Sequence, residues 1–188
     1  VFDEVGGEPV EQFGVSRLLA LAAEIARAAD QAGSSIAVSA NGNTVAIGAP
    51  GNGNISGHTR IYHYDVNAQA WNQLGGDING QADYDASGSQ VAIAADGHTV
   101  AIGSPRHGDL AGHTRIYHYD SQSETWNQRG ADIDGQAAYD ESGSAIALSD
   151  DGSTVAIGAP GSDAHQRDAG HTRVYRYNEA AGAWQLHG

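Results

Sequence analysis

The side chains best suited to chemistry stand in one stretch that the chain carries three times. "GHTRIYHYD" occupies 57–65 and 112–120 letter for letter, and "GHTRVYRYN" occupies 170–178. Each copy offers imidazole, guanidinium and phenol groups, which can transfer protons, bind metal ions or stabilise negative charge. The three copies are either three active sites or three copies of one strand, and the elements around them must decide.

The whole chain repeats with the period of this stretch. Trp71, Trp126 and Trp184 are separated by 55 and then by 58 residues. Pro160, the last proline, follows its equivalent in the second unit by 55 residues. The three additional residues of the last copy therefore lie in the loop after Pro160. A fixed period of this length predicts a tandem-repeat fold, with units at 33–87, 88–142 and 143–188.

Each unit has the pattern of four antiparallel strands. In the first unit Val45 and Ile47 alternate with Ala46 and Gly48, which predicts a strand with one bulky and one small face. An Asn-Gly or Asp-Gly pair precedes this segment in every unit, and such pairs favour tight hairpins because the turn needs positive φ. The "GHTR" stretch and the Trp segment supply the third and fourth strands.

The sequence therefore predicts an all-β fold with one helix, in which three tandem four-stranded antiparallel sheets stack as β-propeller blades in an open three-blade arc. Sheets with two partly apolar faces bury them by stacking on one another. A three-fold β-prism is the alternative, because it also contains three four-stranded sheets. The small Ala/Gly face of the second strand favours the face-to-face stacking of a propeller.

Residues 1–32 are predicted to form a separate N-terminal strand and amphipathic helix. The segment 1–8 resembles the Trp strand of a unit, and the periodicity of 15–31 is helical. The strands that would pair with segment 1–8 would have to precede it in the chain. We therefore expect this segment to add as a strand to a neighbouring copy. The apolar residues predicted for this assembly interface are Phe2, Val5, Leu18, Leu21 and Ile25.

The composition narrows the classes of partner. The chain has 23 acidic residues against nine basic ones and a formal net charge of −14. Nucleic-acid binding needs a basic surface, so we expect none. The apolar runs are too short for a membrane span, and the absence of cysteine excludes thiolate metal sites.

The repeated His, Arg and Trp residues are predicted to be structural. Stacked sheets lie about 10 Å apart, whereas zinc needs its nitrogen ligands about 2 Å from the metal. Equivalent residues of three units therefore cannot share one ion. The residues assigned to this structural set are His58, Arg60, Trp71, His113, Arg115, Trp126, His171, Arg173 and Trp184.

Two further groups of residues are candidates for ligand binding. Oxygen ligands at alternate positions of the linkers suit calcium, although turn capping by Asx residues explains the same pattern. The possible calcium ligands are Asp77, Asn79, Asp83, Asp85, Asp132, Asp134 and Asp140. The inserted loop of the last unit is either surface decoration or a ligand-binding loop, with Asp163, His165, Arg167 and Asp168.

The units resemble a known family. "SGS", an apolar strand, a turn and "VAIGAP" are similar to the FG-GAP repeat of integrin α-subunit propellers, and most of all to bacterial and marine versions with a Trp strand and a "DIDG" linker. The resemblance covers about 33–188 and implies an extracellular or cell-surface propeller used in adhesion. The integrin calcium loop is replaced here by tight turns such as "ANGN", so its metal site is not carried over.

The functional expectation is a non-enzymatic protein, because no nucleophile, phosphate-binding or metalloprotease motif is present. We expect an extracellular structural protein whose partner is itself, assembling as a ring or filament through its open flanks and N-terminal strand. The alternative is an adhesion module excised from a longer FG-GAP propeller, which would bind a glycan or a surface protein.

Overall fold

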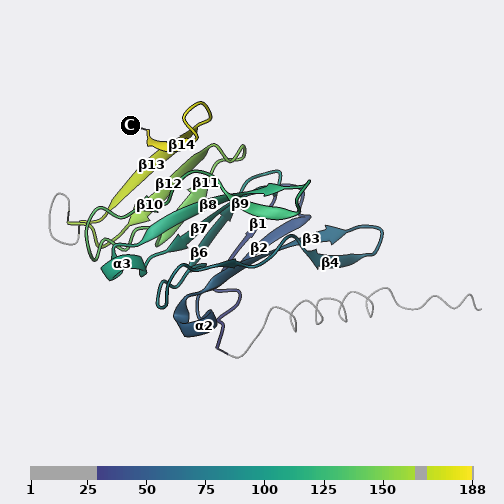
Figure 1. Ribbon diagram of the computed structural model, residues 1–188, viewed down its shortest axis with the longest axis horizontal. Coiled ribbons are helices and arrows are strands. Elements are labelled where there is room, and N and C mark those ends of the chain that lie inside the picture. The colour runs from purple at the N-terminus through teal and green to yellow at the C-terminus, as the bar shows by residue number, and fades with distance from the viewer. Residues whose placement is uncertain (1–28, 164–168, 188) are drawn as a thin grey trace, which may run out of the picture.

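The computed structural model describes residues 29–163 and 169–187, which form three antiparallel sheets in chain order (Figure 1). The first sheet contains β1 (Ser35–Val38), β2 (Thr44–Ala49), β3 (His58–Asp65), β4 (Ala70–Gln73) and β5 (Ile78–Asn79). The second contains β6 (Gln90–Ile93), β7 (Thr99–Ser104), β8 (His113–Asp120), β9 (Thr125–Gln128) and β10 (Ile133–Asp134). The third contains β11 (Ala145–Leu148), β12 (Thr154–Ala159), β13 (His171–Asn178) and β14 (Ala183–Leu186).

The three sheets share one register, as the repeated sequence requires. Ile47 on β2 pairs with Ile36 on β1 and with Arg60 on β3. The corresponding residues of the second and third sheets pair in the same way. The hairpin turn before β2 contains Gly42 with φ of +73°, which is the conformation that the Asn-Gly pair predicts.

The outer strand of each of the first two sheets is interrupted, which the sequence did not predict. β4 pairs with the end of β3, while β5 pairs with its beginning. The break contains Gly75 with φ of +71°, where a Cβ atom would lie 2.8 Å from the ring of Trp126. The strand leaves the sheet here because the indole of the next unit occupies the space beside it.

The hydrophobic cores lie between successive sheets. The first cluster joins Ala46, Ile61 and Ile78 to Val91 and Val100 of the second unit, among others. An equivalent cluster joins the second unit to the third. The sheets therefore pack in series, which confirms the predicted blade-like stacking and an open arc, and not the closed three-fold packing of a prism.

The helical content of the described residues differs from the prediction. Residues 29–31, the end of the predicted helix, form a turn in which Ala29 and Gln31 have positive φ. The remainder of that helix and the predicted N-terminal strand lie outside the described residues, as do Phe2, Val5, Leu18, Leu21 and Ile25. Two short helical turns, α2 (Asn52–Ile55) and α3 (His107–Leu110), stand where loops were expected. None of the described helices is long and apolar enough to cross a membrane.

Candidate functional site

The interface between the first and second units and the interface between the second and third units are built from the same contacts. The exposed faces of the first and third units can be compared with them. The indole Nε1 of Trp126 donates a hydrogen bond of 2.7 Å to the carbonyl oxygen of Leu74. Trp184 makes the same bond, also 2.7 Å, to the carbonyl of Arg129. The second and third units therefore each bind the backbone of the preceding unit through their Trp.

Glycine allows the backbones of successive units to touch. A Cβ atom on Gly48 would lie 2.0 Å from the carbonyl oxygen of Gly88, and one on Gly103 would lie 2.2 Å from that of Gly143. No side chain fits at such distances, so the glycine of the second strand is required by the next sheet.

The first unit has an open face, which we call the front face. Ile36 and Val38 on β1 are 69% and 60% exposed, whereas Val91, the equivalent of Ile36 in the second unit, is 7% exposed. Tyr62 on β3 of the same unit is buried. Among the described residues nothing accepts a hydrogen bond from the Trp71 indole.

The third unit has the complementary open face, which we call the back face. Thr172 is exposed, although its equivalents Thr59 and Thr114 are fully buried between units. The three atoms nearest to a Cβ position on Gly158, at 3.2 to 3.9 Å, all belong to Ala145 in its own sheet. The contacts that the back face makes in the first two units are therefore missing in the third.

The repeated side chains lie at corresponding positions of the three sheets, and their assignment to structure stays a prediction. The "GHTR" copies run along β3, β8 and β13, one in each sheet, so they form no common site. Arg60 holds Asp77 with bonds of 2.9 and 2.8 Å, and this hydrogen bonding lowers the pKa of the Asp77 carboxyl. Arg115 donates to the carbonyl oxygen of Asn79 at 2.8 Å.

The linker carboxylates have protein partners. Asp85 accepts hydrogen bonds from the backbone N–H groups of Gln81 and Ala82. Asp140 does the same with the corresponding two residues of the next linker, and Asn54 donates to Asp83. Turn capping thus accounts for Asp85 and Asp140, and calcium binding by the linkers stays a prediction.

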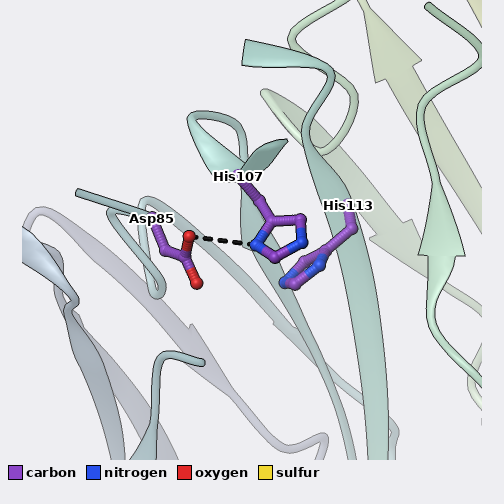
Figure 2. Close-up of side chains that lie close together, drawn as sticks. All are labelled: Asp85, His107 and His113. Carbon is purple, nitrogen blue, oxygen red and sulfur yellow. Dashed lines mark hydrogen bonds and ion pairs between the residues drawn. The ribbon is translucent and has the colours of Figure 1, made fainter. Parts of the chain in front are cut away.

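One group of side chains brings together residues that the sequence analysis had kept apart. Asp85 from the linker, His107 from α3 and His113 from β8 converge between the first two units (Figure 2). The second oxygen of Asp85, Oδ1, lies 2.9 Å from Nδ1 of His107. The rings of His107 and His113 stack with centroids 4.1 Å apart.

His113 is the buried member of this cluster. Its side chain is 0% exposed, and neither ring nitrogen has a hydrogen-bond partner among the described residues. Burial, with smaller effects from His107 and Arg115, lowers the pKa of His113 to about 4. The ring is therefore neutral at pH 7 and offers a free lone pair.

His107 was not selected from the sequence, although a signal for it exists. The equivalent position is Asn52 in the first unit and Ser162 in the third. A histidine that breaks the repeat in one unit cannot be explained by the architecture that all three units share.

The inserted loop of the last unit is only partly described. Asp163 borders a pocket that is also lined by Tyr139, Asp140 and Pro160. His165, Arg167 and Asp168 lie outside the described residues, so the predicted ligand loop stays a prediction.

No family model matches the chain, and no curated protein sequence matches it. Solved structures do resemble it. A candidate 6-phosphogluconolactonase of Bacteroides uniformis has a TM-score of 0.55 and 14% identity, over 80% of this chain and 38% of that one. The periplasmic gluconolactonase PpgL of Pseudomonas aeruginosa has a TM-score of 0.55 and 15% identity, over 82% and 42%. Sqt1 of Saccharomyces cerevisiae has a TM-score of 0.52 and 12% identity, over 85% and 35%.

The chain thus spans about two fifths of the length of these structures. At such low identity the similarity concerns the fold alone. Taken with the serial packing of its four-stranded sheets, it shows a β-propeller architecture in the form of an open arc.

Proposed function

We propose that this chain is a non-enzymatic structural module that assembles head to tail, with the front face of one copy on the back face of the next. One observation carries the proposal: the two open faces are the two halves of an interface that the chain already forms twice within itself. The occupant of each face is accordingly a second copy of the chain.

The repeat specifies the contacts of this interface. His187 is the equivalent of Leu74 and Arg129 in the third unit. Its backbone N–H donates to the Val174 carbonyl at 2.8 Å, and the N–H groups of Leu74 and Arg129 donate to the equivalent carbonyls of their own sheets. Trp71 of one copy is then expected to donate to the carbonyl of His187 in its neighbour.

The glycines give a second expected contact. Gly33 has no atom within 4 Å of a Cβ position, and the three atoms nearest to a Cβ position on Gly158 belong to its own sheet. Their equivalents, Gly88 and Gly48, touch each other between the first two units.

Contacts of this kind are heterologous, so repeated addition gives a ring if the rotation closes and a filament if it does not. A place outside the cell or on its surface, which the resemblance to FG-GAP repeats implies, belongs to the same proposal.

The test is the mass of the particle in solution, measured by sedimentation or light scattering over a range of concentrations. The native chain should form oligomers whose mass rises with concentration. Ile36→Glu on the front face and Val174→Glu on the back face should each give monomers. Val66→Glu changes an exposed apolar residue, 64% exposed, in the β3–β4 turn and serves as the matched control.

Mixing the two blocked variants sharpens the test. Each keeps one intact face, so an equimolar mixture should form a capped dimer and nothing larger. A native chain that stays monomeric at every concentration contradicts the proposal and leaves adhesion to a glycan or surface protein as the better account.

The absence of catalysis is part of the proposal and has its own test. Two of the structural neighbours carry gluconolactonase names, so gluconolactone is the appropriate substrate to try. We expect hydrolysis at the uncatalysed rate; a saturable acceleration by the native chain would show that the protein is an enzyme.

A further inference from the structure

We propose that Asp85, His107 and His113 bind one divalent transition-metal ion, best satisfied by zinc, at the junction of the first and second units. The three side chains offer ligand atoms that all lie within 4.8 Å of one another. They come from the linker, from α3 and from β8 (Figure 2), so an ion would tie three separate segments together.

The strongest argument comes from His113. A buried polar group without a hydrogen bond costs about 1–3 kcal/mol, and native structures rarely keep one without a reason. Both nitrogens of the His113 ring are in this condition. Because the pKa of His113 lies at about 4, the ring is in the neutral form that metal ions bind.

Asp85 is held in a position that suits a ligand. Its Oδ2 accepts backbone hydrogen bonds of 3.1 and 2.8 Å from Gln81 and Ala82. The other oxygen, Oδ1, points at His107. The hydrogen bonds to Oδ2 hold the carboxylate in place, while Oδ1 faces the position of the ion. In metal sites, neighbouring groups commonly hold a ligating carboxylate by hydrogen bonds in the same way.

The ring arrangement requires one movement. Zinc binds imidazole nitrogen at about 2.0–2.1 Å, and two stacked rings 4.1 Å apart do not both point at one ion. His113 is fixed on β8 and fully buried, whereas the His107 side chain is 30% exposed on a short turn. The His107 ring must therefore rotate toward His113 and Asp85, and water completes a tetrahedral site.

The donor set selects the class of metal. Two imidazoles and one carboxylate suit zinc, copper or nickel, whereas calcium and magnesium prefer sets made of oxygen alone. Asp132 and Asp134 also lie close to His113 and offset the charge of a buried cation. The positive charge of the Arg115 guanidinium would repel the cation, but the guanidinium is held by its hydrogen bond to the Asn79 carbonyl oxygen.

The other two units supply natural controls. The first unit has Asp30 and His58 but Asn52 in place of His107, and the third has Asp140 and His171 but Ser162. Both therefore lack one imidazole of the set, and both show that this position tolerates a smaller residue within the fold.

The experiment uses the untagged full chain, freed of metal with a chelator. Zinc is titrated by calorimetry, and cobalt(II) by visible absorption, in which a tetrahedral site gives intense bands. We expect one ion per chain. His107→Asn, which copies the first unit, and Asp85→Asn should weaken binding by more than the ~10–100-fold that loss of an outer partner costs.

The variants are checked for folding by melting in the absence of metal, where His107→Asn should match the native chain. His98→Asn removes an exposed histidine and should bind zinc as the native chain does.

Three results would overturn the proposal. The first is that neither zinc nor cobalt binds, and the second is that His107→Asn and Asp85→Asn bind as tightly as the native chain. The third is that Asp134→Asn abolishes binding while His107→Asn does not, because the ion would then belong to the neighbouring group.

Discussion

At the scale of the residue, the same chemical group serves different purposes according to its neighbours. Asp77 stands in a linker pattern that suits a cation, yet it lies in the fork of Arg60, with Gln73 as a second donor. Asp85 caps a turn with one carboxylate oxygen and contacts His107 with the other. The sequence shows the carboxylates but not which of them faces a guanidinium, because that depends on how strands far apart in the chain are paired.

The ion pair of Asp77 gives a prediction about pH. Hydrogen bonds from Arg60 lower the pKa of Asp77, so its contribution to stability is present above the ordinary pKa and is lost as pH falls through the lowered value. Asp77→Asn should cost about 0.5–1 kcal/mol at pH 7, as partly exposed ion pairs do. Urea unfolding at pH 7 and below pH 3 measures this, and a difference that persists in acid would contradict the assignment.

The cluster around His113 shows what a repeat conceals. His113 was assigned to structure because the same residue recurs in every unit, and its burial agrees with that assignment. His107 went unnoticed because it does not recur. Comparing the units position by position for the residue that departs from the pattern would have found it.

At the scale of the element, two glycines with the same place in the repeat have different surroundings. Gly103→Ala would bring a methyl group to 2.2 Å from the Gly143 carbonyl, and overpacking of this kind costs about 1–3 kcal/mol. The nearest atom to a methyl group in Gly158→Ala is the Cβ of Ala145, at 3.2 Å, so a shift of a few tenths of an ångström relieves the contact and the loss of monomer stability should be below about 1 kcal/mol. Denaturant unfolding compares the two, and equal losses would mean that the back face is covered.

The tryptophans allow a comparison that isolates one hydrogen bond. Trp126 and Trp71 pack in the same way on Tyr119 and Tyr64, with ring centroids 5.2 and 5.4 Å apart. Only Trp126 donates to the preceding unit. Trp126→Phe should therefore cost about 1 kcal/mol more than Trp71→Phe in the monomer, as measured by thermal or urea unfolding. Trp71→Phe should instead weaken self-association, and equal costs with unchanged association would remove the expected bond to His187.

The strands were predictable and their interruptions were not. Alternation at Val45 to Gly48 and the Asn-Gly and Asp-Gly turns are local signals, and they fix strands and hairpins. The break at Gly75 depends on the Trp126 ring, which is 51 residues away. The turns α2 and α3 bond to linker residues about 30 positions later, such as Tyr84 to Asn54 and Tyr139 to Asp109, so a local pattern does not reveal them.

At the scale of the whole molecule, the net charge opposes the proposed association of the open faces. Open faces favour association, while a formal net charge of −14 makes copies repel. Salt screens repulsion between charges more than about 10 Å apart at 0.1 M, but it leaves apolar contacts intact. Raising sodium chloride from about 20 mM to about 300 mM should therefore tighten self-association, as sedimentation would show. Weaker association at high salt would mean that ion pairs hold the copies together.

Each sheet is made from strands that follow one another in the chain, and this has a mechanical consequence. A force applied to the two ends of the chain loads the sheets in line, and each can unravel without threading through another. Extension should then proceed in discrete steps, one for each unit. Each of the first two units, of 55 residues, should release about 180–200 Å of extended chain. The last unit, of 46 residues, should release about 150–165 Å, so that the protein would lengthen under tension in steps of unequal size.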